Sequence, residues 1–139
     1  MQESNRIKKT RLILNAVILA ILAVVIFFAV RPPQVELSKN YICISGLYGV
    51  ELRMQDIDQL ELRESLPQIK ARINGIDLFS FVRRGIYDLE GLGRTRLISF
   101  SNGGPYVLFR AGNEWVVINF KNPEDTEALY QSIENALNE

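Results

Sequence analysis

The sequence predicts one apolar helix followed by a small, mainly β domain of α+β class that a C-terminal helix closes. Three observations support this prediction. An uninterrupted apolar run occupies residues 12–30. Short segments in which apolar and polar residues alternate come after it, a pattern typical of half-buried strands. Residues 122–139 instead repeat apolar side chains at helical spacing.

The run from Leu12 to Val30 is nineteen residues long, and Asn15 is its only residue that is not apolar. At about 1.5 Å per residue, a helix of this length spans roughly 28 Å, which matches the hydrocarbon core of a bilayer. A cleaved signal peptide is the alternative, but its apolar stretch is usually only ~7–15 residues long. Residues 28–33 also offer no small-x-small cleavage pattern. We therefore predict a single retained transmembrane helix over residues 12–30.

Positive charge on either side of this run predicts its orientation. The basic N-terminal segment, residues 1–11, carries four Lys and Arg residues, whereas the other side offers only Arg31 and Lys39. Excess positive charge marks the cytoplasmic side of a span. We therefore predict a protein of the cell membrane with a cytoplasmic N-terminus and an extracytoplasmic domain. Residues 31–40, stiffened by Pro32 and Pro33, are predicted to be a linker, and residues 41–139 a single domain.

The domain is predicted to contain six or seven antiparallel strands. Alternating apolar residues predict strands over 42–44, 49–53, 60–63, 85–90 and 94–100. Residues 102–105, Asn-Gly-Gly-Pro, give the strongest turn signal, and the segments 106–110 and 115–120 are predicted to form a hairpin. Such strands are expected to form a small antiparallel barrel or sandwich.

The C-terminal helix is predicted from its first residues and its apolar stripe. Asn122 suits the N-cap, Pro123 the first helical position, and the acidic residues that follow complement the positive end of the helix. The residues at helical spacing are Leu129, Ile133, Ala136 and Leu137. A helix with such a stripe must cover an apolar surface, and here the sheet or one end of the barrel is available.

Charge and cysteine content exclude several classes of partner and site. The chain after the span holds twelve Lys and Arg residues and fifteen Asp and Glu residues, a net charge of −3. This balance argues against nucleic acid as a partner and against broad adhesion to anionic lipid. The single cysteine, Cys43, has no partner in the chain for an internal disulfide, and we expect it to be a small buried strand residue.

The sequence lacks the residue sets on which most catalysis and metal binding depend. It contains no histidine, which removes His-based triads and the commonest general base. One cysteine without histidine does not make a zinc site, and no phosphate-binding loop motif occurs. Asp56 and Asp58 have the spacing of an acid or metal pair, but we expect them to be solvated turn residues. We therefore predict a protein that is not an enzyme and has no cofactor and no metal.

The order of strands and final helix resembles the pleckstrin-homology (PH) fold, and more specifically the bacterial PH-like domains that accompany transmembrane helices. The resemblance rests on the sequence texture of residues 44–50, 56–62, 72–76, 84–89 and 116–123. It covers nearly everything after residue 40. It implies a non-catalytic module for binding or assembly, and it does not imply the inositide specificity of eukaryotic PH domains.

One basic group is a candidate binding site. Its members are Lys70, Arg72, Arg83 and Arg84, which flank an apolar segment containing Phe79 and Phe81. An exposed apolar loop between cations can enter a lipid headgroup layer or hold an anionic ligand. The alternative, which we favour, places both phenylalanines in the core and the cations at solvated strand ends.

These observations together predict a membrane-anchored, non-catalytic binding or scaffolding module. Its expected partner is another protein, or a second copy of the chain, close to the bilayer. A sensor of a small ligand or lipid headgroup is the alternative, as is an accessory subunit of a membrane enzyme or transporter. An exposed strand edge or apolar patch favours protein assembly, whereas a pocket with convergent polar groups favours the sensor.

Overall fold

The computed structural model describes residues 2–139 and divides into two compact units, residues 1–31 and residues 32–139. The first unit is helix α1, Gln2–Val30, which continues through the basic N-terminal segment as well as the apolar run. Within residues 2–139, α1 is the one helix that is long and apolar enough to cross a membrane. No other element of its unit covers its apolar side chains, which agrees with the predicted membrane helix.

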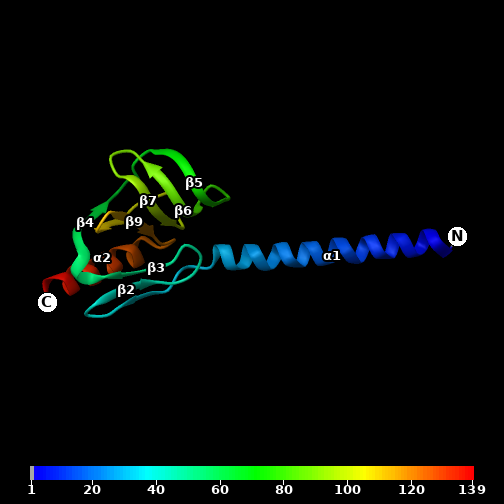
Figure 1. Ribbon diagram of the computed structural model, residues 1–139, viewed down its shortest axis with the longest axis horizontal. Helices are drawn as coiled ribbons and strands as arrows, with labels where there is room; N and C mark the ends of the chain where they lie inside the picture. Colours follow the sequence, from blue (N-terminus) through cyan, green and yellow to red (C-terminus); the bar gives the residue numbers. More distant parts are fainter. Residues whose placement is uncertain (1) are drawn as a thin grey trace. The chain divides into compact units, whose positions relative to one another are not determined.

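The second unit has the predicted α+β class (Figure 1). A three-stranded sheet has the order β1-β2-β3 and a six-stranded sheet the order β4-β8-β9-β7-β6-β5. The first contains β1 (Val35–Leu37), β2 (Tyr41–Ile44) and β3 (Val50–Arg53). The second contains β4 (Ile57–Arg63), β5 (Ile69–Leu78), β6 (Val82–Leu89), β7 (Gly93–Ser99), β8 (Tyr106–Ala111) and β9 (Glu114–Asn119). A short 3-10 helix, Met54–Asp56, connects the two sheets.

Several expectations about the strands need correction. The two sheets do not close into a barrel, and β7 pairs with β9 in parallel rather than antiparallel fashion. Strand β1 lies inside the segment 31–40 that was expected to be a linker, where it pairs with β2. Strand β5, which was not predicted from the sequence, occupies ten residues and pairs with β6. The predicted hairpin is confirmed as β8 and β9.

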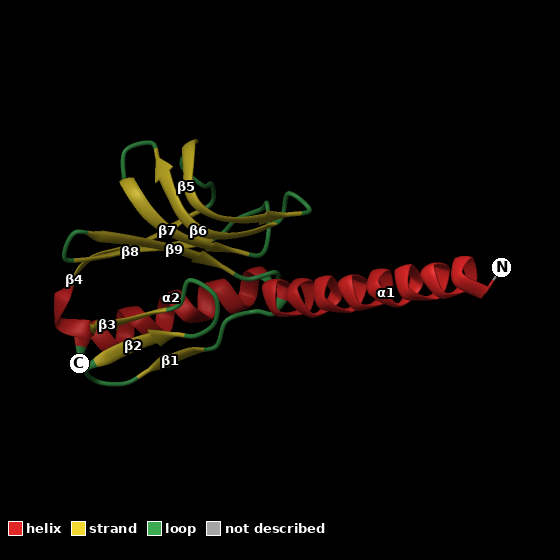
Figure 2. Ribbon diagram, turned by 45° about the vertical axis from the view of Figure 1, so that its right-hand side comes forward, coloured by secondary structure: helices red, strands yellow, loops and turns green. Residues whose placement is uncertain are grey.

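The C-terminal helix α2, Pro123–Asn138, forms as predicted. The side chain of Asn122 accepts a hydrogen bond from the Glu124 amide at 3.2 Å, which caps the first turn. Leu129 and Ile133 are buried, and α2 contacts β4, β8 and β9. Leu137, expected in the same stripe, is instead exposed. Figure 2 shows α2 and the three-stranded sheet on the same side of the six-stranded sheet.

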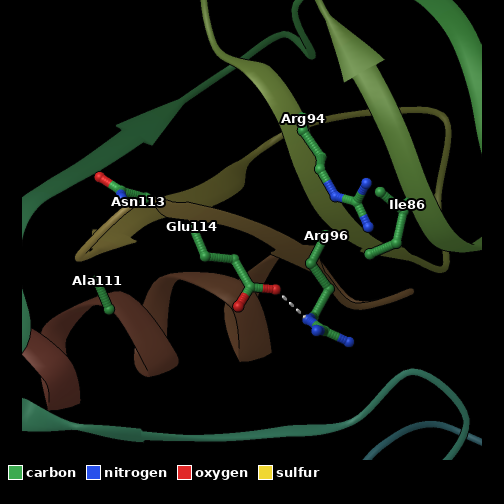
Figure 3. Close-up of a pocket in the computed structure, with 6 residues that line it drawn as sticks. All are labelled: Ile86, Arg94, Arg96, Ala111, Asn113 and Glu114. Atoms are coloured by element: carbon green, nitrogen blue, oxygen red, sulfur yellow. Dashed lines mark hydrogen bonds and ion pairs between the residues drawn. The ribbon is translucent and has the colours of Figure 1, made fainter.

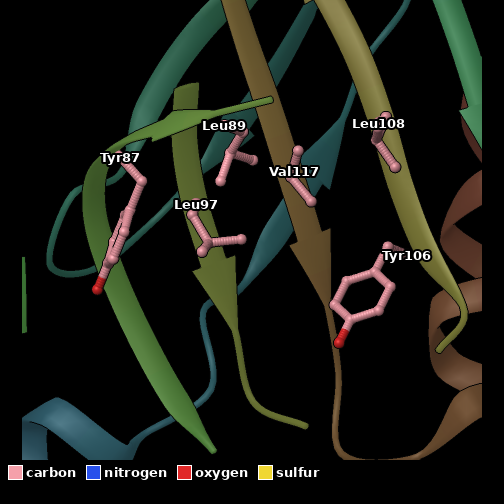
Figure 4. Packing of buried hydrophobic residues seen from close by; sticks show 6 residues of the cluster. All are labelled: Tyr87, Leu89, Leu97, Tyr106, Leu108 and Val117. Atoms are coloured by element: carbon pink, nitrogen blue, oxygen red, sulfur yellow. The ribbon is translucent and has the colours of Figure 1, made fainter. Parts of the chain in front are cut away.

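The central strands of the six-stranded sheet are buried on both faces. On one face, the register aligns Leu97, Val117 and Leu108 across β7, β9 and β8. These residues belong to a cluster of buried apolar and tyrosine side chains (Figure 4). On the other face Ile98 and Ile118 are aligned and equally buried. Burial on both faces explains why these strands are near-continuous apolar runs.

The cluster contains two tyrosines, Tyr87 and Tyr106, from which we expect a dependence of stability on alkaline pH. Burial raises the pKa of both phenols. The Tyr106 hydroxyl donates to the Ser101 carbonyl at 3.2 Å, a bond that a tyrosinate cannot donate. Because the pKa of each phenol is raised in the folded state, the neutral tyrosines stabilise the fold fully at any pH below the pKa that tyrosine has in the unfolded chain. This stabilisation is lost as the pH rises from about 10 through the folded-state value.

We therefore expect the unfolding temperature of the full-length chain in detergent to fall between pH 9 and pH 11. The Tyr106→Phe variant is expected to show a smaller fall, because it removes one of the two groups. Near-ultraviolet circular dichroism follows the transition. An equal fall in the variant and the parent would contradict this assignment.

Candidate functional site

The hairpin of β5 and β6 carries the predicted basic group and the two phenylalanines. Its tip is a short turn, because Leu78 pairs with Val82. Within this turn Phe79 and Ser80 have φ values of 55° and 63°. Residues other than glycine rarely adopt this backbone conformation, which costs about 1 kcal/mol or more per residue. The tip therefore holds its aromatic side chain on strained backbone.

The two phenylalanines are on the surface, which contradicts the favoured alternative that placed them in the core. Phe79 is 67% exposed and Phe81 is 45% exposed. Their rings stack on each other with centroids 5.9 Å apart and an interplanar angle of 22°. Stacking fixes the two rings as one apolar surface at the tip. We call this pair the aromatic tip.

The four predicted cations do not form one site. Arg83 and Arg84 are neighbours on β6, so their side chains leave opposite faces of the strand. Arg83 forms an ion pair with Asp77 at 3.5 Å and donates to Asn102 at 3.3 Å. Lys70 and Arg72 lie exposed on β5. Whether these three side chains bind a ligand remains a prediction.

Arg84 is a core residue, which corrects its expected place on the surface. It is only 2% exposed, and its guanidinium lies 4.8 Å from the centroid of the Phe100 ring. Burial lowers the pKa of this guanidinium, although arginine keeps its charge throughout the physiological range. Arg84 therefore makes a cation–π contact inside the domain and does not lie on its surface.

The structure also contains a pocket that was not predicted from the sequence (Figure 3). Its volume is about 470 Å³, and it is lined by Ile86, Arg94, Arg96, Ala111, Asn113 and Glu114. Strand register explains the grouping, since Ile86 pairs with Arg96 and Ala111 pairs with Glu114. The alternation Arg94-Thr95-Arg96 within a predicted strand was the available signal, because it places both arginines on one face.

The two arginines of the pocket differ in how they are held. The Nε atom of Arg96 donates to Glu114 at 2.7 Å, and an Nη atom donates to the Tyr48 carbonyl at 3.0 Å. Tyr48 in turn donates through its hydroxyl to Asn74 at 2.9 Å. Arg94 is exposed and has no ion pair within residues 2–139. Arg96 is thus fixed in place while Arg94 is available to solvent.

The remaining candidate residues have structural explanations. Asp56 pairs with Arg53 at 2.9 Å, whereas Asp58 pairs with Arg110 across β4 and β8. The hydrogen bond from Arg110 lowers the pKa of the Asp58 carboxyl. The two aspartates therefore have separate partners. Cys43 is a half-buried free thiol on β2, and residues 2–139 contain no group of three or more His, Cys, Asp or Glu side chains that could hold a metal ion.

Comparison of the chain with protein-family models, with curated proteins and with solved structures finds no match. The features of this chain that bear on function are therefore the aromatic tip, the pocket and the apolar helix.

Proposed function

We propose that this chain is a single-pass membrane protein whose β domain binds another protein at the membrane surface without catalysing a reaction. In this proposal α1 is a retained anchor with its N-terminus in the cytoplasm, and residues 32–139 lie outside. The implication of the PH-like resemblance, a binding or assembly module, agrees with it. The parallel pairing of β7 with β9 departs from the antiparallel order on which that resemblance rests.

The aromatic tip is the observation that carries this proposal. Two stacked aromatic rings stay in water although the rest of the domain buries most of its large apolar side chains. One of them, Phe79, also stands on strained backbone. Exposure and strain both destabilise the isolated domain, and both are offset when a partner covers the rings. Aromatic side chains are also the commonest energetic anchors of protein interfaces.

Charge favours a protein partner over an anionic lipid surface. The cation closest in sequence to the tip, Arg83, is neutralised by Asp77. Residues 32–139 hold eleven Lys and Arg residues and fifteen Asp and Glu residues, a net charge of −4. Anionic headgroups attract basic residues that lie next to the membrane, but they repel a negatively charged domain.

The tip is also better suited to docking than the exposed edge of β5. This edge strand has register shifts between residues 69 and 71 and between residues 72 and 74, and it carries Lys70 and Arg72. Bulges and charges of this kind prevent strands from other chains from pairing with an edge. We therefore assign the partner to the tip and not to β-strand addition.

The connection to α1 keeps the domain near the bilayer. Helix α1 ends at Val30 and β1 begins at Val35. The four intervening residues include Pro32 and Pro33 and reach at most ~14 Å when extended. A domain tethered so closely is expected to meet partners of the same membrane.

Photocrosslinking from the tip tests this proposal. A photoreactive phenylalanine analogue at position 81 of the full-length chain, activated in intact membranes, is expected to give one discrete protein adduct. Adding Phe79→Asn is expected to lower the yield at least about tenfold, since it removes an aromatic anchor. Asparagine tolerates positive φ, so this variant should be at least as stable as the parent.

The matched control is Ser80→Asn, which makes the same backbone adjustment one residue away and retains both rings. It is expected to leave the crosslink unchanged. An adduct of twice the chain's mass would identify the partner as a second copy. Labelling of lipid alone would favour the headgroup alternative, and equal yields from the Phe79→Asn and Ser80→Asn variants would exclude the tip as the docking surface.

A further inference from the structure

We propose that the pocket lined by Arg94 and Arg96 binds a small organic anion, a carboxylate or phosphate attached to an apolar group. This site is separate from the aromatic tip and goes beyond the proposed assembly function. Its volume of about 470 Å³ lies within the range of small-molecule sites.

The charges of the pocket favour an anion. Arg94 and Arg96 lie two residues apart on β7, so they share one face at a spacing of roughly 7 Å. Glu114 offsets one of these charges through its contact with Arg96, which leaves a net charge of +1 on the lining. Arg94 has no ion pair within residues 2–139, so an anion held next to it neutralises the remaining positive charge.

The hydrogen-bond donors of the pocket are partly pre-positioned. Arg96 uses two of its N–H groups on Glu114 and on the Tyr48 carbonyl, and a guanidinium carries five. Those two bonds hold the remaining N–H groups of Arg96 in place. The side chain is also only 18% exposed, which restricts its movement further. Arg94 adds a solvent-accessible guanidinium to the lining. Guanidinium groups suit carboxylate and phosphate oxygens because they can donate two parallel hydrogen bonds.

Apolar side chains complete the lining and restrict the class of ligand. Ile86 and Ala111 provide the apolar part of the pocket. Figure 3 shows Arg94 next to Ile86, with Arg96 joined to Glu114. A bare inorganic ion would leave the apolar side chains in contact with water. An anion with an attached ring or short chain would use both the donors and the apolar side chains.

Binding of small probes to the full-length chain in nanodiscs tests this inference. The probes are benzoate, phenyl phosphate, benzyl alcohol and benzylamine, and nuclear magnetic resonance shifts of backbone amides report binding. Benzoate and phenyl phosphate are expected to shift residues 94–96 and 111–114 in a saturable way. Benzyl alcohol and benzylamine are expected to leave these signals in place. Tighter binding of phenyl phosphate than of benzoate would indicate a phosphate ligand, and the reverse order a carboxylate ligand.

The Arg94→Gln variant removes the exposed charge without touching the contacts of Arg96. It is expected to weaken binding of both anions about tenfold or more. The matched control is Lys121→Gln, which removes an exposed positive charge outside the pocket and is expected to leave binding unchanged. Equal weakening by the two substitutions, or equal shifts with benzyl alcohol, would overturn the inference. Photocrosslinking from the tip does not depend on either substitution, so the two proposals can fail separately.

Discussion

The intact chain is expected to stay entirely with the membrane in high salt and in alkaline carbonate, and a chain starting at Pro32 is expected to be soluble and folded. Fourteen of the nineteen residues from 12 to 30 are Leu, Ile, Val or Phe. At the centre of a span each of these favours insertion by about 0.3–0.6 kcal/mol, so together they contribute roughly 4–8 kcal/mol. The extraction of full-length protein into the carbonate supernatant would contradict this expectation.

The starting residue of the soluble fragment is set by the structure. A fragment that begins at Tyr41 lacks β1, which pairs with β2 through residues 35–37. It also loses the hydrogen bonds between Gln34 and Ser45. We therefore expect the fragment 41–139 to unfold at a lower urea concentration than the fragment 32–139. Equal midpoints would show that β1 adds nothing to the domain.

Protease digestion of sealed cells tests the orientation of the chain in the membrane. Protease added to sealed cells is expected to digest the domain, because the excess of positive charge lies on the N-terminal side of the span. If digestion requires lysis, the domain is cytoplasmic and its partner must be sought there.

Gly85→Ala is expected to lower the free energy of unfolding of the domain by more than about 3 kcal/mol. This loss exceeds that expected for a substitution at any exposed residue. Gly85 pairs with Gly75 where β5 and β6 approach each other closely. A Cβ atom at Gly85 would lie 2.2 Å from the Asn74 carbonyl oxygen and 2.4 Å from the Gly75 Cα atom. Both are backbone atoms that cannot rotate away, and φ is also positive at 149°.

Gly112→Ala is the matched control for this substitution. Gly112 has a φ of 61°, but a Cβ atom there would meet nothing within 4 Å. The control therefore measures the cost of positive φ, about 1 kcal/mol, without the steric clash. Urea unfolding of the two variants compares the effects, and similar losses of stability would show that the close approach of β5 and β6 is unimportant.

Local patterns in the sequence were sufficient for the parts of the fold that depend on neighbouring residues. The apolar run predicted α1, and Asn122 with Pro123 predicted the start of α2. Alternation predicted most strands, including the β8 and β9 hairpin. It did not reveal β5, because bulges interrupt the alternation and most of its side chains are exposed.

The candidate sites depended on contacts between segments that are distant in the sequence. Alternation shows which residues share one face of a strand, but it does not show whether another element covers that face. For this reason Phe79 and Phe81 were expected inside and are exposed, while Arg84 was expected outside and is buried against Phe100. The pocket likewise requires Ile86, Arg96 and Glu114 to meet from three strands.

The sequence by itself determined a long apolar helix near the N-terminus, an α+β domain and a chain without histidine. These properties follow from composition and from periodicities of a few residues. Only the tertiary structure decided the parallel pairing of β7 with β9, the exposure of the aromatic tip and the position of the two arginines in one pocket. The physical reason is that strand pairing and burial are set by the packing of the whole domain, in which residues far apart in the chain compete to cover the same apolar surface.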